Sequence, residues 1–414
     1  MSVNLSSNHP TPDAPAPAFP SAGGADGASP VRTLAIGRVP PPPPVEGRPS
    51  FARGLWRIAA ADVSSGNRVR LLHDGPETFD EMIGLVEGAH ESVMLESYIV
   101  RSDEVGERFA GPLVAAAQRG VRVRLLADWV GMRGTSREFF DRLRRGGVEV
   151  RIFNPPGMRP WLGLVPRDHR KLLVVDEAVG VTGGVGLGRE WTTGVQKRRR
   201  QRWRDTAVRI EGPAAGDMTR AFEAMWRRAS HPRERRSSHR LLARVAQRAH
   251  LDPALHEPAL VGIVEGEPGR LRVARALQIQ AVSAERSIWI ASAYFVPSYA
   301  EMEALIGAAR DGVDVRILVP SRYDHPWISR LTRRHYRRLL HNGVRVWEWQ
   351  GEMMHAKTSV VDGRYTRVGS TDFNPLGVAI NFELDAVIED RPLGAEAEAM
   401  FLEDLTRSVE IERA

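Results

Sequence analysis

Several residue types and patterns are missing from this chain of 414 residues. It contains no cysteine, which excludes disulfide bonds, thiolate metal sites and a cysteine nucleophile. No stretch approaches the ~20 consecutive apolar residues that span a bilayer, and the N-terminus lacks the charged and then apolar layout of a secretion signal. Hydrophobic residues make up 42% and charged residues 26% of the chain, which is enough for two sizeable cores.

Lysine is almost absent as well. The chain has 58 lysines and arginines together, and only Lys171, Lys197 and Lys357 are lysines. Arginine therefore serves wherever a general positive charge suffices, and the few lysines indicate a chemical requirement. Arginine presents a broad planar fork, whereas the compact lysine ammonium can approach one phosphate oxygen as a point charge.

Two of the three lysines lie in a repeated pattern, H-x-K-x-x-x-x-D. The copies begin at His169 and His355, and their lysines are Lys171 and Lys357. Each copy continues as an apolar run and a glycine turn, which predicts a strand, a turn and a second strand. Residues two apart on a strand share a face, so the histidine and the lysine of each copy point together. Each copy thus supplies half of a site with two histidines and two lysines.

The duplication extends upstream of the two copies. Three further pairs of segments match in order and at similar spacing: 92–98 with 287–294, 120–126 with 312–318, and 147–150 with 343–346. Helical patterns such as 109–118 and 302–309 lie between them. Each half is therefore expected to be an α/β unit with the order strand, helix, strand, helix, strand and a mainly parallel sheet.

These motifs resemble those of the phospholipase D superfamily, and the flanking segments resemble its bacterial cardiolipin synthases of the type without N-terminal transmembrane helices. The resemblance runs from about Val69 to Val409 and includes 153–155, 167–171, 203–205, 293–297, 324–326, 355–357 and 381–383. It implies a pseudo-twofold pair of α/β/α sandwiches with one active site at their interface. The expected parts are a disordered Pro/Ala-rich tail (1–52), a first half (53–230), a basic linker (231–256) and a second half (257–414).

The resemblance also implies the chemistry. His169 is the expected nucleophile, and His355 is the acid that later acts as the base. A covalent phosphatidyl-histidine then forms, and the hydroxyl of a second substrate resolves it. Lys171 and Lys357 stabilise the charge on the phosphate oxygens. No zinc-ligand spacing, H-E-x-x-H motif or dense aspartate cluster indicates a metal, so we expect neither a metal nor another cofactor.

The motif aspartates, Asp176 and Asp362, are also expected to be catalytic, although an aspartate at a strand end is often only a turn former that braces a loop. Further positions match supporting residues of the family: Gly184, Glu190, Ser370, Asp372 and Glu383.

Two of these supporting residues are acids that should orient the histidines. Glu190 and Glu383 are expected to accept a hydrogen bond from the second ring nitrogen, without indication of which glutamate serves which histidine. Family members often carry asparagine at the positions of Gly186 and Asp372. This departure leaves the fold and the nucleophile intact but affects rate and substrate preference.

The net charge of +7 is unevenly distributed. Residues 197–202 form a basic cluster, and residues 227–248 contain eight arginines against one acid, Glu234. Such segments attract anionic lipid headgroups by ~1 kcal/mol per residue near a membrane, but they attract a nucleic-acid backbone as well. The apolar residues of loop 155–168, among them Trp161, favour contact with acyl chains over stacking with bases; packing of this loop onto its own domain is the alternative. Nucleic acid is thus not the expected partner.

Neither the acceptor nor the oligomeric state follows from these patterns, and three functions remain open. The first is phosphatidyl transfer that makes cardiolipin from phosphatidylglycerol and a second phospholipid, by a peripheral enzyme at the cytoplasmic face of the inner membrane. The second is a phosphodiesterase that passes the intermediate to water and acts on phospholipid or nucleic acid. The third is a catalytically weak relative that binds lipid, motivated only by Gly186 and Asp372.

Overall fold

The computed structural model describes residues 51–155, 166–192, 202–230 and 259–412. The expected linker, the apolar residues of the loop at 156–165, the basic residues 197–201 and the expected tail up to residue 50 lie outside these ranges.

The first half begins with two short helical segments and continues as alternating strands and helices. Its elements are α1 (Phe51–Gly54), η1 (Leu55–Ala59), β1 (Asp62–His73), α2 (Asp74–Glu87), β2 (Ser92–Ser97), α3 (Glu104–Gln118), β3 (Arg122–Asp128), α4 (Arg137–Arg145), β4 (Glu149–Phe153), β5 (Lys171–Val175), β6 (Val179–Gly183), η2 (Arg189–Trp191), β7 (Thr206–Glu211) and α5 (Pro213–Ser230).

The second half repeats this order, with one extra strand at its end. Its elements are β8 (Ala259–Gly266), α6 (Arg272–Ser283), β9 (Ser287–Ser292), α7 (Tyr299–Arg310), β10 (Asp314–Pro320), α8 (Pro326–His341), β11 (Arg345–Trp349), β12 (Lys357–Val361), β13 (Tyr365–Gly369), η3 (Leu376–Ile380), β14 (Glu383–Glu389), α9 (Arg391–Thr406) and β15 (Ser408–Glu410).

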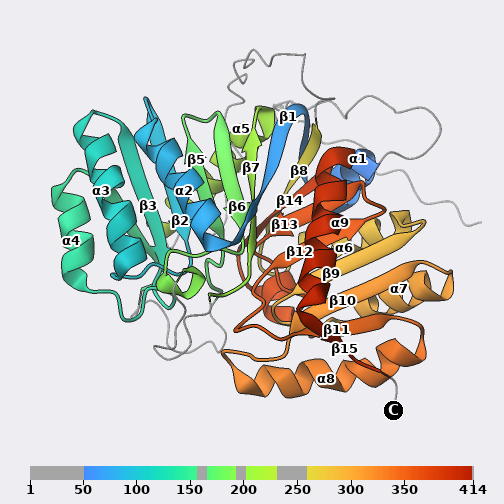
Figure 1. Cartoon of the computed structure of the whole chain (residues 1–414). Coiled ribbons are helices and arrows are strands. Elements are labelled where there is room, and N and C mark those ends of the chain that lie inside the picture. Colours follow the sequence, from blue (N-terminus) through green and yellow to red (C-terminus); the bar gives the residue numbers. More distant parts are fainter. Residues whose placement is uncertain (1–50, 156–165, 193–201, 231–258, 413–414) are drawn as a thin grey trace, which may run out of the picture. The chain divides into compact units, whose positions relative to one another are not determined.

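The strands of the described residues form one 15-stranded sheet that crosses both halves, in the order β15-β11-β10-β9-β12-β13-β14-β8-β1-β7-β6-β5-β2-β3-β4 (Figure 1). β1 and β8 pair antiparallel at its centre. Counted outward from this pair, the strands of the first half and their counterparts in the second half follow the same order. This is the pseudo-twofold α/β arrangement that the duplication predicts.

The expectation of a mainly parallel sheet in each half is wrong. β2, β3 and β4 are parallel to one another, as are β9, β10 and β11. The other neighbours pair antiparallel, including β5 with β2 and β6. A hairpin between consecutive strands can only produce antiparallel pairing, and such hairpins join β5 to β6 and β12 to β13.

Alternate residues of the central strands face different helical layers. Leu172 on β5 belongs to the core cluster that contains Met218 and Phe222 of α5. Its neighbour Leu173 belongs to the cluster with Phe109 of α3. Strands buried on both faces require continuous apolar runs, and each such leucine contributes about 1.5–3 kcal/mol through burial.

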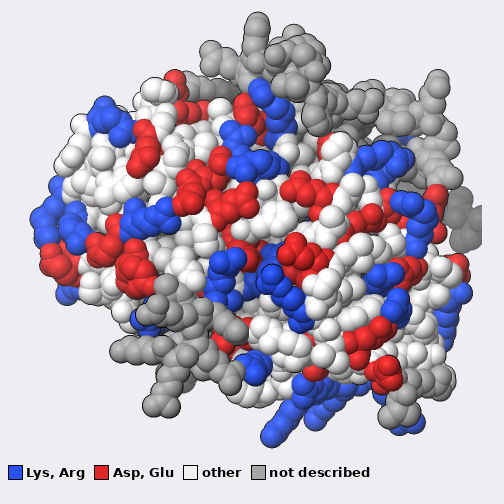
Figure 2. All heavy atoms as spheres, viewed as in Figure 1, with Lys and Arg blue, Asp and Glu red and all other residues white. Residues whose placement is uncertain are grey.

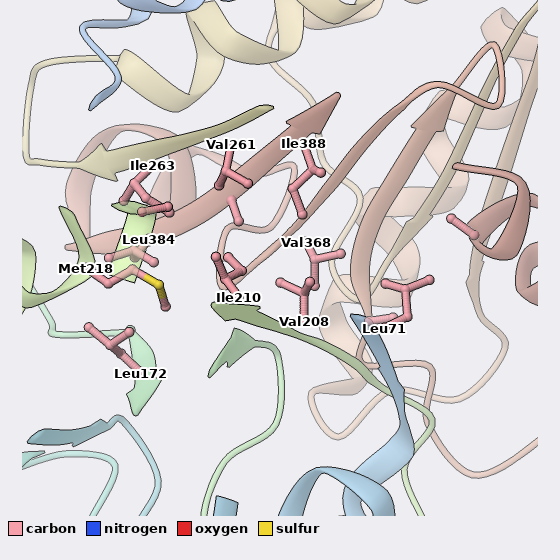
Figure 3. Packing of buried hydrophobic residues seen from close by; sticks show 14 of the residues in the cluster. Leu71, Leu172, Val208, Ile210, Met218, Val261, Ile263, Val368, Leu384 and Ile388 are labelled. Atoms are coloured by element: carbon pink, nitrogen blue, oxygen red, sulfur yellow. The ribbon is translucent and has the colours of Figure 1, made fainter. Parts of the chain in front are cut away.

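The two halves share a core as well as a sheet. Val208 and Ile210 on β7 lie in one cluster with Val368 on β13 and Ile388 on β14 (Figure 3). β13 and β14 lie against β6 and β7 across this cluster. The interface that carries the site is therefore supported by packed apolar side chains from both copies of the repeat.

Candidate active site

The two copies of the histidine–lysine motif meet at a cavity of about 580 Å³. β5 begins at Lys171 and β12 at Lys357, and each motif histidine lies two residues before its strand. His169, Lys171 and His355 line the cavity. Lys357 is fully buried, and its Nζ lies 3.2 Å from Nε2 of His355. The two half-sites that the sequence predicts are thus brought together.

Backbone hydrogen bonds attach each motif histidine to the other half. The N–H of His169 donates to the carbonyl of Phe382 at 2.9 Å. The N–H of His355 donates to the carbonyl of Arg204 at 2.7 Å. In each case the residue after the accepting carbonyl is an acid at or directly before the last central strand of that half.

The first of these acids is Glu383, at the start of β14. Nδ1 of His169 lies 3.0 and 3.1 Å from its two carboxylate oxygens. The hydroxyl of Ser370 also donates to Glu383, and the N–H of Leu384 donates to that hydroxyl oxygen at 3.0 Å. An ionised Glu383 accepts from Nδ1–H and leaves Nε2 of His169 without hydrogen.

The second acid is Asp205, directly before β7. Nδ1 of His355 lies 2.7 Å from Oδ2 of Asp205, and the indole N–H of Trp191 donates to the same oxygen at 2.8 Å. Gly184 occupies the position equivalent to Ser370, and a Cβ added there would lie 2.2 Å from Oδ1 of Asp205. Gly184 therefore supports the site by leaving room for this carboxylate.

Asp205 was missing from the residues expected to orient a histidine, and Glu190 was wrongly given that role. Glu190 lines the cavity but pairs with Arg101, whose Nε lies 3.1 Å from its Oε1. The two halves differ in the length of chain between the glycine turn and this acid, so the distance from the turn does not identify Asp205. The signal in the sequence that could have identified it is an acid at or directly before the last central strand of each half, which Asp205 and Glu383 share.

Each lysine is fixed by its own histidine and faces an aromatic ring. Nζ of Lys171 donates to the carbonyl of His169 at 2.6 Å and lies 5.4 Å from the ring centre of Tyr98. In the second copy, Nζ of Lys357 donates to the carbonyl of His355 at 2.7 Å. Both ammonium groups are held in place before any substrate binds.

Burial dominates the electrostatics of the site. Burial lowers the pKa of His169 and of His355 well below the ordinary value, and the neighbouring lysines lower it further. It raises the pKa of Glu383 to about 8 and that of Asp205 to about 6, and it lowers the pKa of Lys171 to about 8. Both histidines are therefore neutral in the empty cavity, and a bound anionic phosphate would offset the lysine charge.

Asp372 and Gly186 occupy equivalent positions with different surroundings. Oδ1 of Asp372 lies 3.4 Å from Nζ of Lys357 and accepts from the N–H of Tyr294 at 3.3 Å. Burial raises the pKa of Asp372, and the lysine opposes that shift. A Cβ at Gly186 would lie 2.9 Å from Cη2 of Trp191, so this ring fills the space that a side chain there would need.

The motif aspartates do not reach the cavity, which corrects the expectation that they are catalytic. Asp176 and Asp362 lie at the far ends of β5 and β12, in turns with positive φ. The carboxylate of Asp176 accepts from the N–H groups of residues 90, 91 and 92 at 2.7–2.9 Å. That of Asp362 accepts from the N–H groups of residues 285, 286 and 287 at 2.8–2.9 Å. Both fix the loop that leads into the neighbouring strand.

Both halves line the cavity with polar and apolar residues. Arg101, Arg133 and Glu190 line it from the first half, and Asp324 and His325 from the second. We call the apolar residues that the second half contributes the apolar side of the cavity: Val296, Trp327, Ile328, Leu331 and Leu376. Trp327 is 59% exposed and Leu376 is 41% exposed, so the apolar side continues onto the surface.

Two further properties concern only the part of the chain that the structure describes. No helix in it combines the length and apolar character needed to cross a membrane. No group of three or more histidine, aspartate or glutamate side chains in it is arranged to hold a metal ion.

The chain is similar in sequence to known proteins. The family model described as "Cardiolipin synthase, PLD-like domain" matches residues 82–226 and 278–405. The cardiolipin synthase of Listeria monocytogenes serotype 4a (strain HCC23) is 32% identical over 357 residues, which cover 85% of this chain and 71% of the relative. That of Geobacillus kaustophilus (strain HTA426) is 33% identical over 368 residues, covering 86% and 69%.

Solved structures share the fold at lower identity. A phosphatidylserine synthase of Haemophilus influenzae Rd KW20 superposes with a TM-score of 0.66 at 12% identity, covering 87% of this chain and 92% of that one. A polyphosphate kinase of Porphyromonas gingivalis has a TM-score of 0.56 at 14% identity, covering 83% of this chain and 48% of that one. These two likenesses concern the fold alone. The family model that matches segments in both halves and the identity to the curated relatives show that the chain belongs to the cardiolipin synthase family of phospholipase D-like proteins.

Proposed function

We propose that the protein transfers a phosphatidyl group from phosphatidylglycerol to a hydroxyl of a second phospholipid, and that cardiolipin is the product when that acceptor is also phosphatidylglycerol. One observation carries the proposal: at a single cavity, an acid from the opposite half holds Nδ1 of each motif histidine. Paired, oppositely oriented imidazoles suit a double displacement, in which one attacks while the other moves protons.

The surroundings of the two histidines support different roles. Nδ1 of His169 lies 3.1 Å from Oε2 of Glu383, and the side chain is 15% exposed. Nε2 of His355 lies 3.2 Å from Nζ of Lys357, and that side chain is 5% exposed. His169 is accordingly the nucleophile, and His355 is the proton carrier.

The proposed reaction has two steps. The bound anionic phosphate offsets the lysine charge that lowers the pKa of His355, and His355 takes up a proton from solvent. Nε2 of His169 then attacks phosphorus, the bond from phosphorus to the glycerol oxygen breaks, and protonated His355 gives its proton to that oxygen as glycerol departs. Neutral His355 then takes the proton of the acceptor hydroxyl, whose oxygen attacks phosphorus as the bond to His169 breaks. Lys171 and Lys357 stabilise the negative charge on the phosphate oxygens in both steps.

Two features favour a lipid over other phosphodiesters. The apolar side of the cavity, with Trp327, Ile328 and Leu376, suits acyl chains. The curated relatives are named cardiolipin synthases. Since phosphatidylglycerol is a membrane lipid, we place the protein peripherally at the cytoplasmic face of the inner membrane.

The test incubates purified protein with phosphatidylglycerol vesicles and separates the lipids by thin-layer chromatography, with released glycerol measured in parallel. We expect cardiolipin and glycerol in equal amounts, and neither with His169→Ala. Phosphatidic acid in place of cardiolipin would mean hydrolysis, since water would then resolve the intermediate. No lipid product with the wild-type protein would leave only lipid binding and overturn the proposal.

A further inference from the structure

Helix α8 carries an exposed row of one tryptophan and three arginines. We call Trp327, Arg330, Arg334 and Arg337 the α8 stripe. Their spacings of three, four and three residues put all four side chains on one face, within about 80° of arc and over ~15 Å of helix. All four are exposed, and Figure 2 shows basic side chains at the lower edge, where Figure 1 places α8.

The arginines of the α8 stripe differ from other arginines of this helix in their ion pairs. Arg330, Arg334 and Arg337 form no ion pair with any residue that the structure describes. Their neighbours on the same helix differ: Arg333 pairs with Glu348, and Arg338 pairs with Glu303. Three adjacent positive charges without acids repel one another, so the stripe favours an anionic partner.

The stripe joins the apolar side of the cavity at its tryptophan end. Trp327 belongs both to the stripe and to the cavity lining, beside Ile328 and Leu331 of the same helix. Leu376 of η3 lies on the same lining and is 41% exposed. An exposed aromatic residue next to arginines, continuous with an apolar opening, is the composition of a surface that lies in a lipid headgroup region.

We infer that the α8 stripe docks on the anionic headgroups of a phospholipid bilayer, with Trp327 at the acyl boundary, so that the cavity opens directly to its lipid. This inference rests on the proposed function, because a lipid substrate must leave the membrane to reach His169. A nucleic-acid backbone would also attract arginines, but it gives no account of the apolar opening beside Trp327.

The main test measures co-sedimentation with vesicles of phosphatidylglycerol and phosphatidylcholine, and with phosphatidylcholine alone. Each arginine near an anionic surface strengthens binding by about fivefold. The full-length variant R330Q/R334Q/R337Q should therefore bind the anionic vesicles on the order of a hundredfold more weakly. High salt should weaken the binding of the wild-type protein to anionic vesicles toward the level of the variant.

The matched control is R122Q/R137Q/R391Q. It removes the same charge from three exposed arginines on other elements that form no ion pair within the described residues. This control should bind nearly as the wild type does. If both triple variants bind anionic vesicles equally weakly, net charge alone explains the loss, and the inference is overturned. Unchanged vesicle binding by the stripe variant would also overturn it. Loss of oligonucleotide binding with vesicle binding intact would assign the stripe to nucleic acid instead.

A second measurement tests whether Trp327 inserts as far as the acyl chains of the bilayer. Vesicles that contain phosphatidylglycerol with brominated acyl chains should quench the fluorescence of the wild type more than that of W327F, although the chain has 10 tryptophans. Equal quenching of both proteins would overturn the insertion. Neither measurement needs turnover, so each stands even if the protein makes no cardiolipin.

The stripe variant should also keep its turnover of short-chain phosphatidylglycerol in detergent micelles, because its arginines do not line the cavity. Loss of that turnover would mean damage to the active site and would count against a role in docking alone.

Discussion

Nδ1 of His169 lies 3.1 Å from Oε2 of Glu383, although 214 residues separate them in the chain. The reverse contact joins His355 to Asp205 at 2.7 Å over 150 residues. Each half therefore provides a histidine for the cavity and the acid for the other half's histidine. The pseudo-twofold repeat makes a site that neither half contains alone.

The covalent step gives the first prediction. Acid quench of the enzyme with labelled phosphatidylglycerol should trap lipid on the wild type and on H355A but not on H169A. In the proposed first step, His355 assists the leaving group and His169 forms the bond to phosphorus. Turnover should be lost in both variants while their Tm stays near that of the wild type. An adduct retained in H169A and lost in H355A would reverse the two roles.

Asp205 is expected to act by positioning His355. D205N should lower kcat by a hundredfold to ten-thousandfold, on the order seen when an amide replaces the acid behind a catalytic histidine and holds the wrong tautomer. KM should change little. D217N, which alters a buried aspartate paired with Arg220 elsewhere, is the control and should keep kcat. Normal kcat in D205N together with an inactive E190Q would return this role to Glu190.

Lys171 sets the pH dependence on the alkaline side. Its pKa is lowered to about 8, so its charge is present below that pH and lost above it. Glu383, with a pKa raised to about 8, must be ionised to accept from Nδ1–H of His169, so kcat/KM should rise toward pH 8 and fall beyond it.

K171R should remove the fall above pH 8, because arginine stays protonated. The kcat should drop by a hundredfold or more, because the larger guanidinium misplaces the positive charge. Loss of one comparable contact lowers the stabilisation of the transition state by ~2.7–4 kcal/mol. K357R is the matched control and should keep the alkaline fall. A profile identical in K171R and wild type would assign the fall to another group.

Asp372 lies 3.4 Å from Lys357, and we expect its carboxylate to offset part of the positive charge that Lys357 presents to the substrate. D372N should lower KM for phosphatidylglycerol, because the ammonium 3.4 Å away is no longer neutralised by a carboxylate. Its Tm should fall, since a buried charge loses its partner. If D372N instead abolishes turnover with KM unchanged, the carboxylate serves as a hydrogen-bond acceptor for the second substrate.

The motif aspartates should matter for stability and not for chemistry. D176A removes three hydrogen bonds to backbone N–H groups, and the free energy of unfolding should drop by about 1–3 kcal/mol. Denaturant titration measures this loss. The kcat per folded molecule should remain near the wild-type value, and D362A should behave in the same way. A large loss of kcat with normal stability would restore a catalytic role for these residues.

Much of the site could be predicted from the sequence because its motif is short and occurs twice. The motif predicted that His169 and Lys171 point together, and both line the cavity, although His169 precedes β5 and does not lie on the expected strand. The order of the repeated segments predicted the two α/β halves in the same way. These inferences use contacts that are local in the chain or copied by duplication.

The predictions that failed depend on contacts between segments far apart in the chain. The role of Asp205 depends on the position of β7 beside the second half, and the spacing from the glycine turn to Asp205 differs from the spacing to Glu383. The hydrogen bonds of Asp176 to residues 90–92 lie within the first half but join positions 84–86 residues apart, which the motif does not indicate. Nor did either half's pattern show that β1 and β8 would join two sheets into one.

The exchange of acids between the halves also has a consequence for synthesis on the ribosome. Chains fold from the N-terminus as they emerge, and Glu383 begins β14, the last central strand to be made. Until Glu383 has been made, His169 lacks the carboxylate that orients its ring. Under the proposed mechanism, we therefore expect the growing chain to remain inactive toward lipid until β14 has been synthesised and packed.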